Sequence, residues 1–171
     1  PQLGIKPKEF WRRAKAMAED QQADEILAYM HVMLEEARQK QVSVTRSAFA
    51  EFGKKVELFE GVEDWFPRID GVGRKNGLTV RHYIVSSGLR EMIEATAIAK
   101  RFTKIYASAF MYDHNDVPCW PALAVNYTTK TQFLFRINKG VLDVWDDKKI
   151  NDFVPKEERP VPFSRMVYIG D

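Results

Sequence analysis

The chain has 171 residues, with 26 Lys and Arg against 24 Asp and Glu, and 45% of its residues are hydrophobic. This length and composition predict a folded domain with a substantial core, alone or with a small accessory lobe, and argue against a disordered chain. The net charge of +2 gives no electrostatic reason to expect nucleic acid, and no apolar run reaches the roughly 18 residues of a membrane span. Cys119, the single cysteine, has no partner for an internal disulfide, which fits a cytoplasmic protein.

The first part of the sequence, up to about residue 58, has a helical pattern. Pro7 suits the first turn of a helix, and apolar residues follow it at helical spacing. A second amphipathic helix is predicted over about 24–40. A third helix is predicted after Ser43-Val44-Thr45, which offers two residues suited to an N-cap.

From about residue 60 onward, strand-like and helical segments alternate. The sequence predicts helices at 61–70, 89–102, 130–137 and about 148–153, and strands at 78–85, 104–112, 117–126 and 166–169. Gly71, Gly73 and Gly77 are expected to end the first of these helices, and Ser86-Ser87-Gly88 to end the first strand. The turn Asp-His-Asn-Asp joins two of the strands into a predicted β-hairpin.

This alternation favours an α/β fold with a mostly parallel, Rossmann-like sheet covered on both faces. In such sheets, ligands bind beyond the carboxyl ends of the strands. Three polar features are predicted to lie at strand ends of this kind. They are Ser86-Ser87-Gly88, the lysine of Thr128-Thr129-Lys130, and the final Gly170-Asp171.

The serine segment has the residue types of an anion-binding turn. A hydroxyl at a strand end, followed by glycine and a helix start, places donors beside the positive end of the helix dipole. Ser86 or Ser87 would add a hydroxyl donor to these backbone groups. The alternative is plain helix capping by serine.

Lys130 and Asp171 add charge of both signs. The helix dipole disfavours a lysine at a helix start unless an anion is bound there, whereas Lys139 near the helix end needs no such explanation. Asp171 follows an apolar segment, and a carboxylate at a strand tip can hold Mg²⁺. A solvated lysine and a turn aspartate remain the alternatives. Taken together, the hydroxyl, the lysine and the carboxylate fit a phosphate bound beside Mg²⁺.

These segments resemble three motifs of a known enzyme family. Val85-Ser86-Ser87-Gly88, Lys130 and Tyr168-Ile169-Gly170-Asp171 are similar to the second, third and fourth motifs of the haloacid dehalogenase-like (HAD) hydrolases. The closest likeness is to the phosphoserine phosphatase-like branch, and it extends from about residue 60 to 171. The resemblance implies a HAD-like α/β core at 59–171 that contains the hairpin, with residues 1–58 forming the inserted helical cap.

The resemblance also implies an activity and a role for each motif residue. The protein would be a Mg²⁺-dependent phosphatase of small phosphorylated metabolites that forms an aspartyl-phosphate intermediate, with no nucleic-acid or membrane partner. Ser86 would bind the phosphoryl oxygens within the turn that Ser87 and Gly88 complete, Lys130 would pair with the phosphate and the nucleophile, and Asp171 would bind Mg²⁺. Both Lys130 and Lys139 lie farther from Asp171 than is usual, which an insertion at 141–165 would explain.

The sequence departs from the family at the first motif, Asp-x-Asp, which supplies the nucleophile. That motif is absent, since Asp113-His114-Asn115-Asp116 belongs to the predicted hairpin turn. A second acidic residue expected after Asp171 is absent as well. The resemblance therefore predicts that this sequence is the middle of an enzyme, without its nucleophile. The alternative is a binding or regulatory module that keeps the scaffold without the chemistry.

Overall fold

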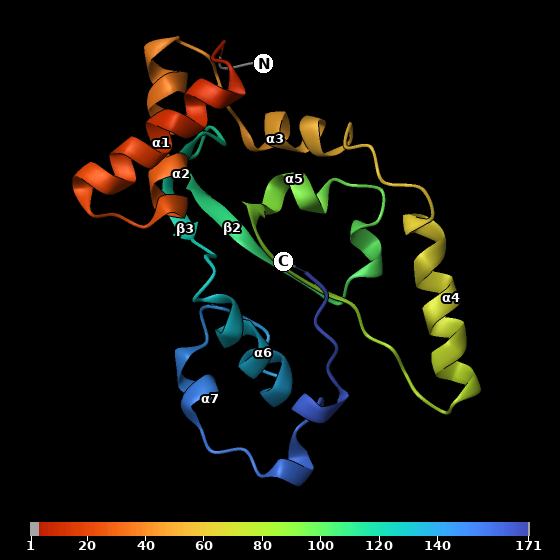
Figure 1. Ribbon diagram of the computed structural model, residues 1–171. Helices are drawn as coiled ribbons and strands as arrows, with labels where there is room; N and C mark the ends of the chain where they lie inside the picture. The colour runs from red at the N-terminus through yellow and green to blue at the C-terminus, as the bar shows by residue number, and fades with distance from the viewer. Residues whose placement is uncertain (1–3, 171) are drawn as a thin grey trace. The chain divides into compact units, whose positions relative to one another are not determined.

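The computed structural model describes residues 4–170 of the chain and shows a mixed α/β protein (Figure 1). About half of the chain is helical, and the described strands form one sheet of three. The chain divides into two compact units, Pro1–Asn126 and Tyr127–Asp171. Within the described residues, none of the helices combines the length and the apolar character that a membrane crossing requires.

The first unit contains most of the helices and the whole sheet. Its elements are α1 (Pro7–Gln21), α2 (Glu25–Gln39), α3 (Arg46–Gly53), α4 (Val62–Lys75), β1 (Tyr83–Leu89), α5 (Arg90–Glu94), η1 (Ala99–Arg101), β2 (Lys104–Tyr112) and β3 (Pro118–Leu123). The second unit contains α6 (Lys130–Lys139), α7 (Asp147–Asn151), η2 (Lys156–Glu158) and η3 (Phe163–Arg165). The three N-terminal helices, the hairpin and the helices that begin at 130 and near 148 confirm the predictions from the sequence.

Side chains fix the starts of the second and third helices. The Asp24 carboxylate accepts hydrogen bonds from the backbone N–H groups of Ile26 and Leu27, at 2.9 and 3.1 Å. The Thr45 hydroxyl accepts one from the N–H of Ala48 at 3.2 Å. Each bond satisfies a donor that the first helical turn leaves without an intrahelical partner, so the sequence locates these helix starts locally.

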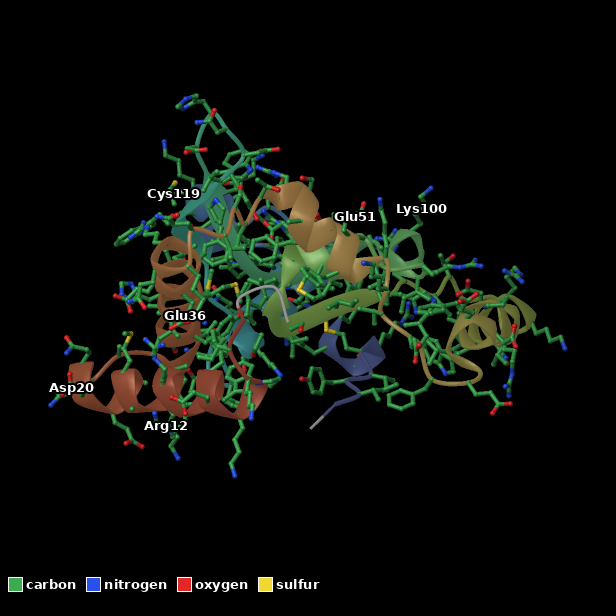
Figure 2. The ribbon with its side chains drawn as sticks, turned by 90° about the horizontal axis from the view of Figure 1, so that it is seen from above. Arg12, Asp20, Glu36, Glu51, Lys100 and Cys119 are labelled. Carbon is green, nitrogen blue, oxygen red and sulfur yellow. The ribbon has the colours of Figure 1, made fainter. Side chains whose placement is uncertain are left out.

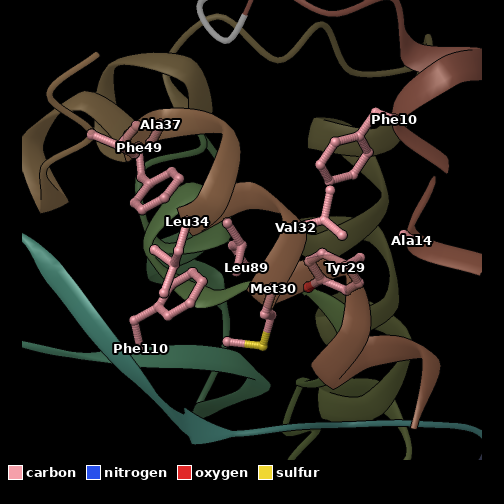
Figure 3. Close-up of a cluster of buried hydrophobic side chains, with 11 residues drawn as sticks. Phe10, Ala14, Tyr29, Met30, Val32, Leu34, Ala37, Phe49, Leu89 and Phe110 are labelled. Atoms are coloured by element: carbon pink, nitrogen blue, oxygen red, sulfur yellow. The ribbon is translucent and has the colours of Figure 1, made fainter. Parts of the chain in front are cut away.

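One hydrophobic cluster joins the N-terminal helices to the sheet. It contains apolar residues of α1, α2 and α3 together with Leu89 of β1 and Phe110 of β2. Figure 3 shows Leu89 near the middle of this group. The ring of Phe110 is stacked on that of Phe49, with centroids 6.0 Å apart. The first three helices therefore share their core with the strands of the same unit.

A buried carboxylate links α1 to α2. Glu36 is buried and forms ion pairs with Arg13 and with Lys40, whose Nζ lies 3.0 Å from Glu36 Oε2. In Figure 2, Glu36 lies between these helices, whereas Arg12 and Asp20 are on the outer side of α1. Two cations thus compensate the desolvation of this carboxylate.

The sheet combines one parallel and one antiparallel pair. β1 runs parallel to β2, with Tyr83 opposite Lys104 and Ser86 opposite Ala107. β3 runs antiparallel to β2 and pairs with its second half, from Ala109 onward. The central strand β2 thus has a different ladder partner along each half.

The second unit is organised around α6. Phe133 and Ile137 are buried, as the predicted apolar face requires. The buried Arg136 guanidinium donates to the carbonyl oxygens of Asp143 and Val144, at 2.7 and 3.1 Å. These bonds attach the following loop to the helix and satisfy a buried cation.

Three predicted boundaries near β1 are wrong. The strand expected at 78–85 lies at Tyr83–Leu89 because pairing with β2 begins at Tyr83. The segment Ser86-Ser87-Gly88 consequently lies inside β1 and does not end it. The helix expected at 89–102 is split into α5 and η1, because the Thr96 hydroxyl donates to the Ile93 carbonyl at 2.7 Å and competes with helix continuation.

Two further predictions are corrected elsewhere in the chain. Gly71 and Gly73 do not end α4, which continues to Lys75. A Cβ on Gly73 would lie 2.6 Å from Val80 Cγ2, so this glycine serves close packing. Residues 166–169 form no strand, since they have no ladder partner among the described residues and Val167 is 87% exposed.

The contact between α3 and α5 leads to a stability prediction. A Cβ on Gly53 would lie 2.0 Å from the Met92 carbonyl oxygen, so Gly53→Ala should lower the free energy of unfolding by at least about 2 kcal/mol. Gly71→Ala is the matched control, because the nearest atom to its Cβ would be 3.9 Å away. That variant should be unchanged or more stable by about 0.5–1 kcal/mol. Urea unfolding measures both, and equal midpoints would contradict the close contact.

Candidate functional site

The predicted anion-binding turn, Ser86-Ser87-Gly88 (the serine turn), is a bulge within β1 that lies just before the last residue of the strand, Leu89. The pairing of β1 with β2 shifts register between Ser86 and Leu89, so Ser87 and Gly88 bulge out of the ladder. The Ser86 Oγ accepts a hydrogen bond from the Gly88 N–H at 3.1 Å. This bond leaves the Ser86 hydroxyl hydrogen available to donate. A half-buried hydroxyl is thus presented where a parallel strand gives way to α5, the usual place for a ligand in α/β sheets.

Tyr29 of α2 contacts this turn from the core. Its hydroxyl donates to the Ser87 carbonyl oxygen at 2.8 Å, and the side chain is 6% exposed. Burial raises the pKa of Tyr29 to about 12, against a smaller lowering by a hydrogen bond with Ser108. The buried phenol therefore stays neutral and remains a donor at physiological pH.

A second buried polar group follows the turn directly. Glu91 of α5 is 5% exposed, and neither of its carboxylate oxygens makes a hydrogen bond within the described residues; the same holds for the Tyr112 hydroxyl. Burial, and then the nearby Glu91 charge, raise the pKa of Tyr112. Arg90 Nη2 lies 3.7 Å from Glu91 Oε1, and the Arg46 guanidinium lies 4.1 Å from the Tyr112 ring centroid. Glu91 thus lies beside Arg90 and Tyr112, and Arg46 packs on the ring of that tyrosine.

The two candidate lysines differ in what they contact. Lys139 Nζ donates to the carbonyl oxygens of Ile150 and Asp152, at 2.6 and 2.8 Å, and so ties α6 to the segment around α7. Lys130 is half-buried at the first position of α6, with its Nζ 5.4 Å from the Tyr127 ring centroid. The backbone contacts give Lys139 a structural role, which makes Lys130 the better candidate for a ligand.

The structure brings together only part of the predicted site. Ser86, Ser87 and Gly88 lie side by side in the first unit, whereas Lys130 belongs to the second unit. Asp171 lies outside the described residues. Between residues 4 and 170, no group of three His, Cys, Asp or Glu side chains is placed to hold a metal ion. The Mg²⁺ site therefore stays a prediction.

Sequence reasoning did not find the polar groups around the serine turn. Tyr29 was hidden in the apolar stripe of a helix 58 positions away along the chain, and no local pattern marks such a contact. Glu91 falls in the helix predicted at 89–102 and was not singled out. The one feature of the sequence that could have indicated a role for Glu91 is its position three residues after Gly88 of the serine motif.

Comparison with known proteins provides one informative relative. The chain is 32% identical over 146 residues to a protein of Borreliella burgdorferi described only as uncharacterized, an alignment that covers 75% of this chain and 50% of that protein. The chain therefore spans about half the length of the curated relative it matches. No protein-family model and no solved structure matches it.

The raised pKa of Tyr29 predicts an alkaline loss of stability. An unfolded tyrosine ionises around pH 10, whereas Tyr29 in the fold ionises at about 12. Between these values the folded state holds a proton that the unfolded state has lost, so stability falls as the pH rises. At about 1.36 kcal/mol per pH unit, the total loss is roughly 2–3 kcal/mol.

Urea unfolding at pH 9, 10, 11 and about 12 would measure this slope. Tyr29→Phe should make it shallower, because the variant lacks this phenol, while the raised pKa of Tyr112 keeps part of the slope. Tyr127→Phe is the control, since Tyr127 is 78% exposed and its loss should leave the slope unchanged. An unaltered slope in Tyr29→Phe would contradict the burial argument.

Proposed function

We propose that this chain is part of a Mg²⁺-dependent phosphomonoester hydrolase of the HAD type that acts on a small phosphorylated metabolite. The observation that supports this most is the turn at the end of β1. It presents the Ser86 hydroxyl, with a hydrogen to donate, at the carboxyl end of a strand that is parallel to its neighbour. Such a hydroxyl can bind a phosphoryl oxygen as charge develops on it.

The proposal includes a larger sheet than the three described strands. β1 is an edge strand among the described residues, with β2 on one side. Its residues Tyr83 to Ser86 are half-buried and contain no proline or charge of the kind that protects an open edge. A further parallel strand at this edge would complete the mostly parallel, Rossmann-like core that the sequence predicts.

The chemistry would be divided among several segments. Ser86 would bind and orient the phosphoryl oxygens, with Ser87 and Gly88 shaping the turn, and the Lys130 ammonium would neutralise charge on the phosphate. An aspartate from a segment outside residues 1–171 would attack phosphorus as the ester oxygen leaves, and water would then hydrolyse the aspartyl phosphate. Asp171 would be a ligand for Mg²⁺, which when bound supplies further charge neutralisation.

Kinetics of the full-length protein test this proposal. With p-nitrophenyl phosphate and Mg²⁺, Ser86→Ala and Lys130→Ala should each lower kcat/KM by about a hundredfold, the usual loss when one group that stabilises the transition-state charge is removed. The melting temperature of these two variants should stay close to that of the wild type, because neither side chain is buried.

Lys139→Ala is the matched control for the lysine assignment. It should lower the melting temperature, because two backbone carbonyls lose their donor, while keeping kcat/KM. The reverse pattern would assign the motif to Lys139. A full-length protein that binds orthophosphate and hydrolyses no phosphomonoester, with or without Mg²⁺, would overturn the enzyme and favour a binding module.

A further inference from the structure

We infer that Tyr29 is a positioning residue for the phosphate-binding turn: its buried hydroxyl fixes the Ser87 carbonyl, and thereby the orientation of the Ser86 hydroxyl. This inference rests on the proposed function of that turn as a phosphate site. Tyr29 belongs to α2, far from the turn in sequence, and touches no group assigned to the reaction. It would act through the backbone that it holds.

The ladder between β1 and β2 is interrupted at the serine turn. β1 pairs with β2 up to Ser86 and again at Leu89, which lies opposite Ser108. The register shift leaves the intervening backbone without regular partners. The Tyr29 hydroxyl supplies a donor to the Ser87 carbonyl at 2.8 Å, in the place that a strand N–H would otherwise take.

The same peptide unit connects this bond to the Ser86 hydroxyl. The Ser87 carbonyl and the Gly88 N–H belong to one planar peptide, and that N–H donates to Ser86 Oγ. An anchored Ser87 carbonyl therefore holds the Gly88 N–H in place, and the Gly88 N–H in turn fixes the direction in which Ser86 can donate its hydrogen.

The Tyr29 side chain is held rigidly by its surroundings. Tyr29 is buried, its ring packs edge-on against Trp11 with centroids 5.5 Å apart, and its neighbour Met30 is fully buried. A hydroxyl on such a side chain has little freedom to move. The removal of this hydroxyl would leave the Ser87 carbonyl without its donor and would let the bulge relax.

Val32→Ala is the matched control. It truncates a buried residue of α2 that belongs to the same core and contributes no polar group. It therefore tests for a loss of stability in the same helix without the loss of a hydroxyl.

The kinetic experiment compares these variants of the full-length protein below their melting temperatures. Tyr29→Phe should lower kcat for p-nitrophenyl phosphate about tenfold with a smaller change in KM, because Ser86 is misoriented and not removed. Val32→Ala should lower the melting temperature while keeping kcat, because it removes buried apolar contacts and leaves the Tyr29 hydroxyl in place. A loss of kcat in Val32→Ala equal to that in Tyr29→Phe would show a merely structural role and overturn the inference.

A second measurement does not depend on activity. In amide hydrogen exchange followed by NMR, Tyr29→Phe should make the Gly88 amide exchange at least tenfold faster, while the Ala107 amide of the central strand keeps its rate. Unchanged Gly88 exchange would overturn the inference even in an active enzyme. If the wild type hydrolyses no phosphomonoester, the proposed function fails, and the Gly88 amide still decides whether Tyr29 holds the turn.

Discussion

The burial of the central strand is the constraint on which the first unit depends. Five consecutive residues of β2, from Tyr106 to Phe110, are 0–2% exposed, so both faces of this strand must be covered and every polar group in it must find a partner. Ser108 is one of them, and its hydroxyl accepts a hydrogen bond from the Val125 N–H at 3.0 Å. It also lies where β2 exchanges β1 for β3 as its ladder partner.

The geometry of the serine turn follows from this change of ladder partner along β2, from β1 to β3. Because the parallel ladder ends with Leu89 opposite Ser108, the two residues before Leu89 are displaced from the sheet. The bulge, and not the capping of a helix, gives Ser86 its contact with the Gly88 N–H. α5 has only five residues, so the hydroxyl and the fixed backbone contribute more to this candidate site than a helix dipole would.

Local chemistry was predictable from the sequence, and long-range chemistry was not. The start of the second helix near Asp24, the cap at Thr45 and the hairpin turn depend on neighbouring residues, and the structure confirms them. The strand at 78–85 was misplaced because β-propensity cannot tell which residues find a ladder partner. Gly73 was taken for a helix breaker, since its close contact with Val80 depends on the path of the chain after the helix.

The first unit contains two buried glutamates that differ in how well their charges are compensated. Glu36 is paired with two cations between α1 and α2, which compensates its burial. Glu91 is buried to a similar degree, its carboxylate makes no hydrogen bond among the described residues, and Arg90 Nη2 lies 3.7 Å from its Oε1. A carboxylate in this state lowers stability, and it lies three positions after Gly88. Proteins accept a stability cost of this kind mainly where function requires it, and the position of Glu91 beside the serine turn therefore supports the proposal that this segment binds a ligand.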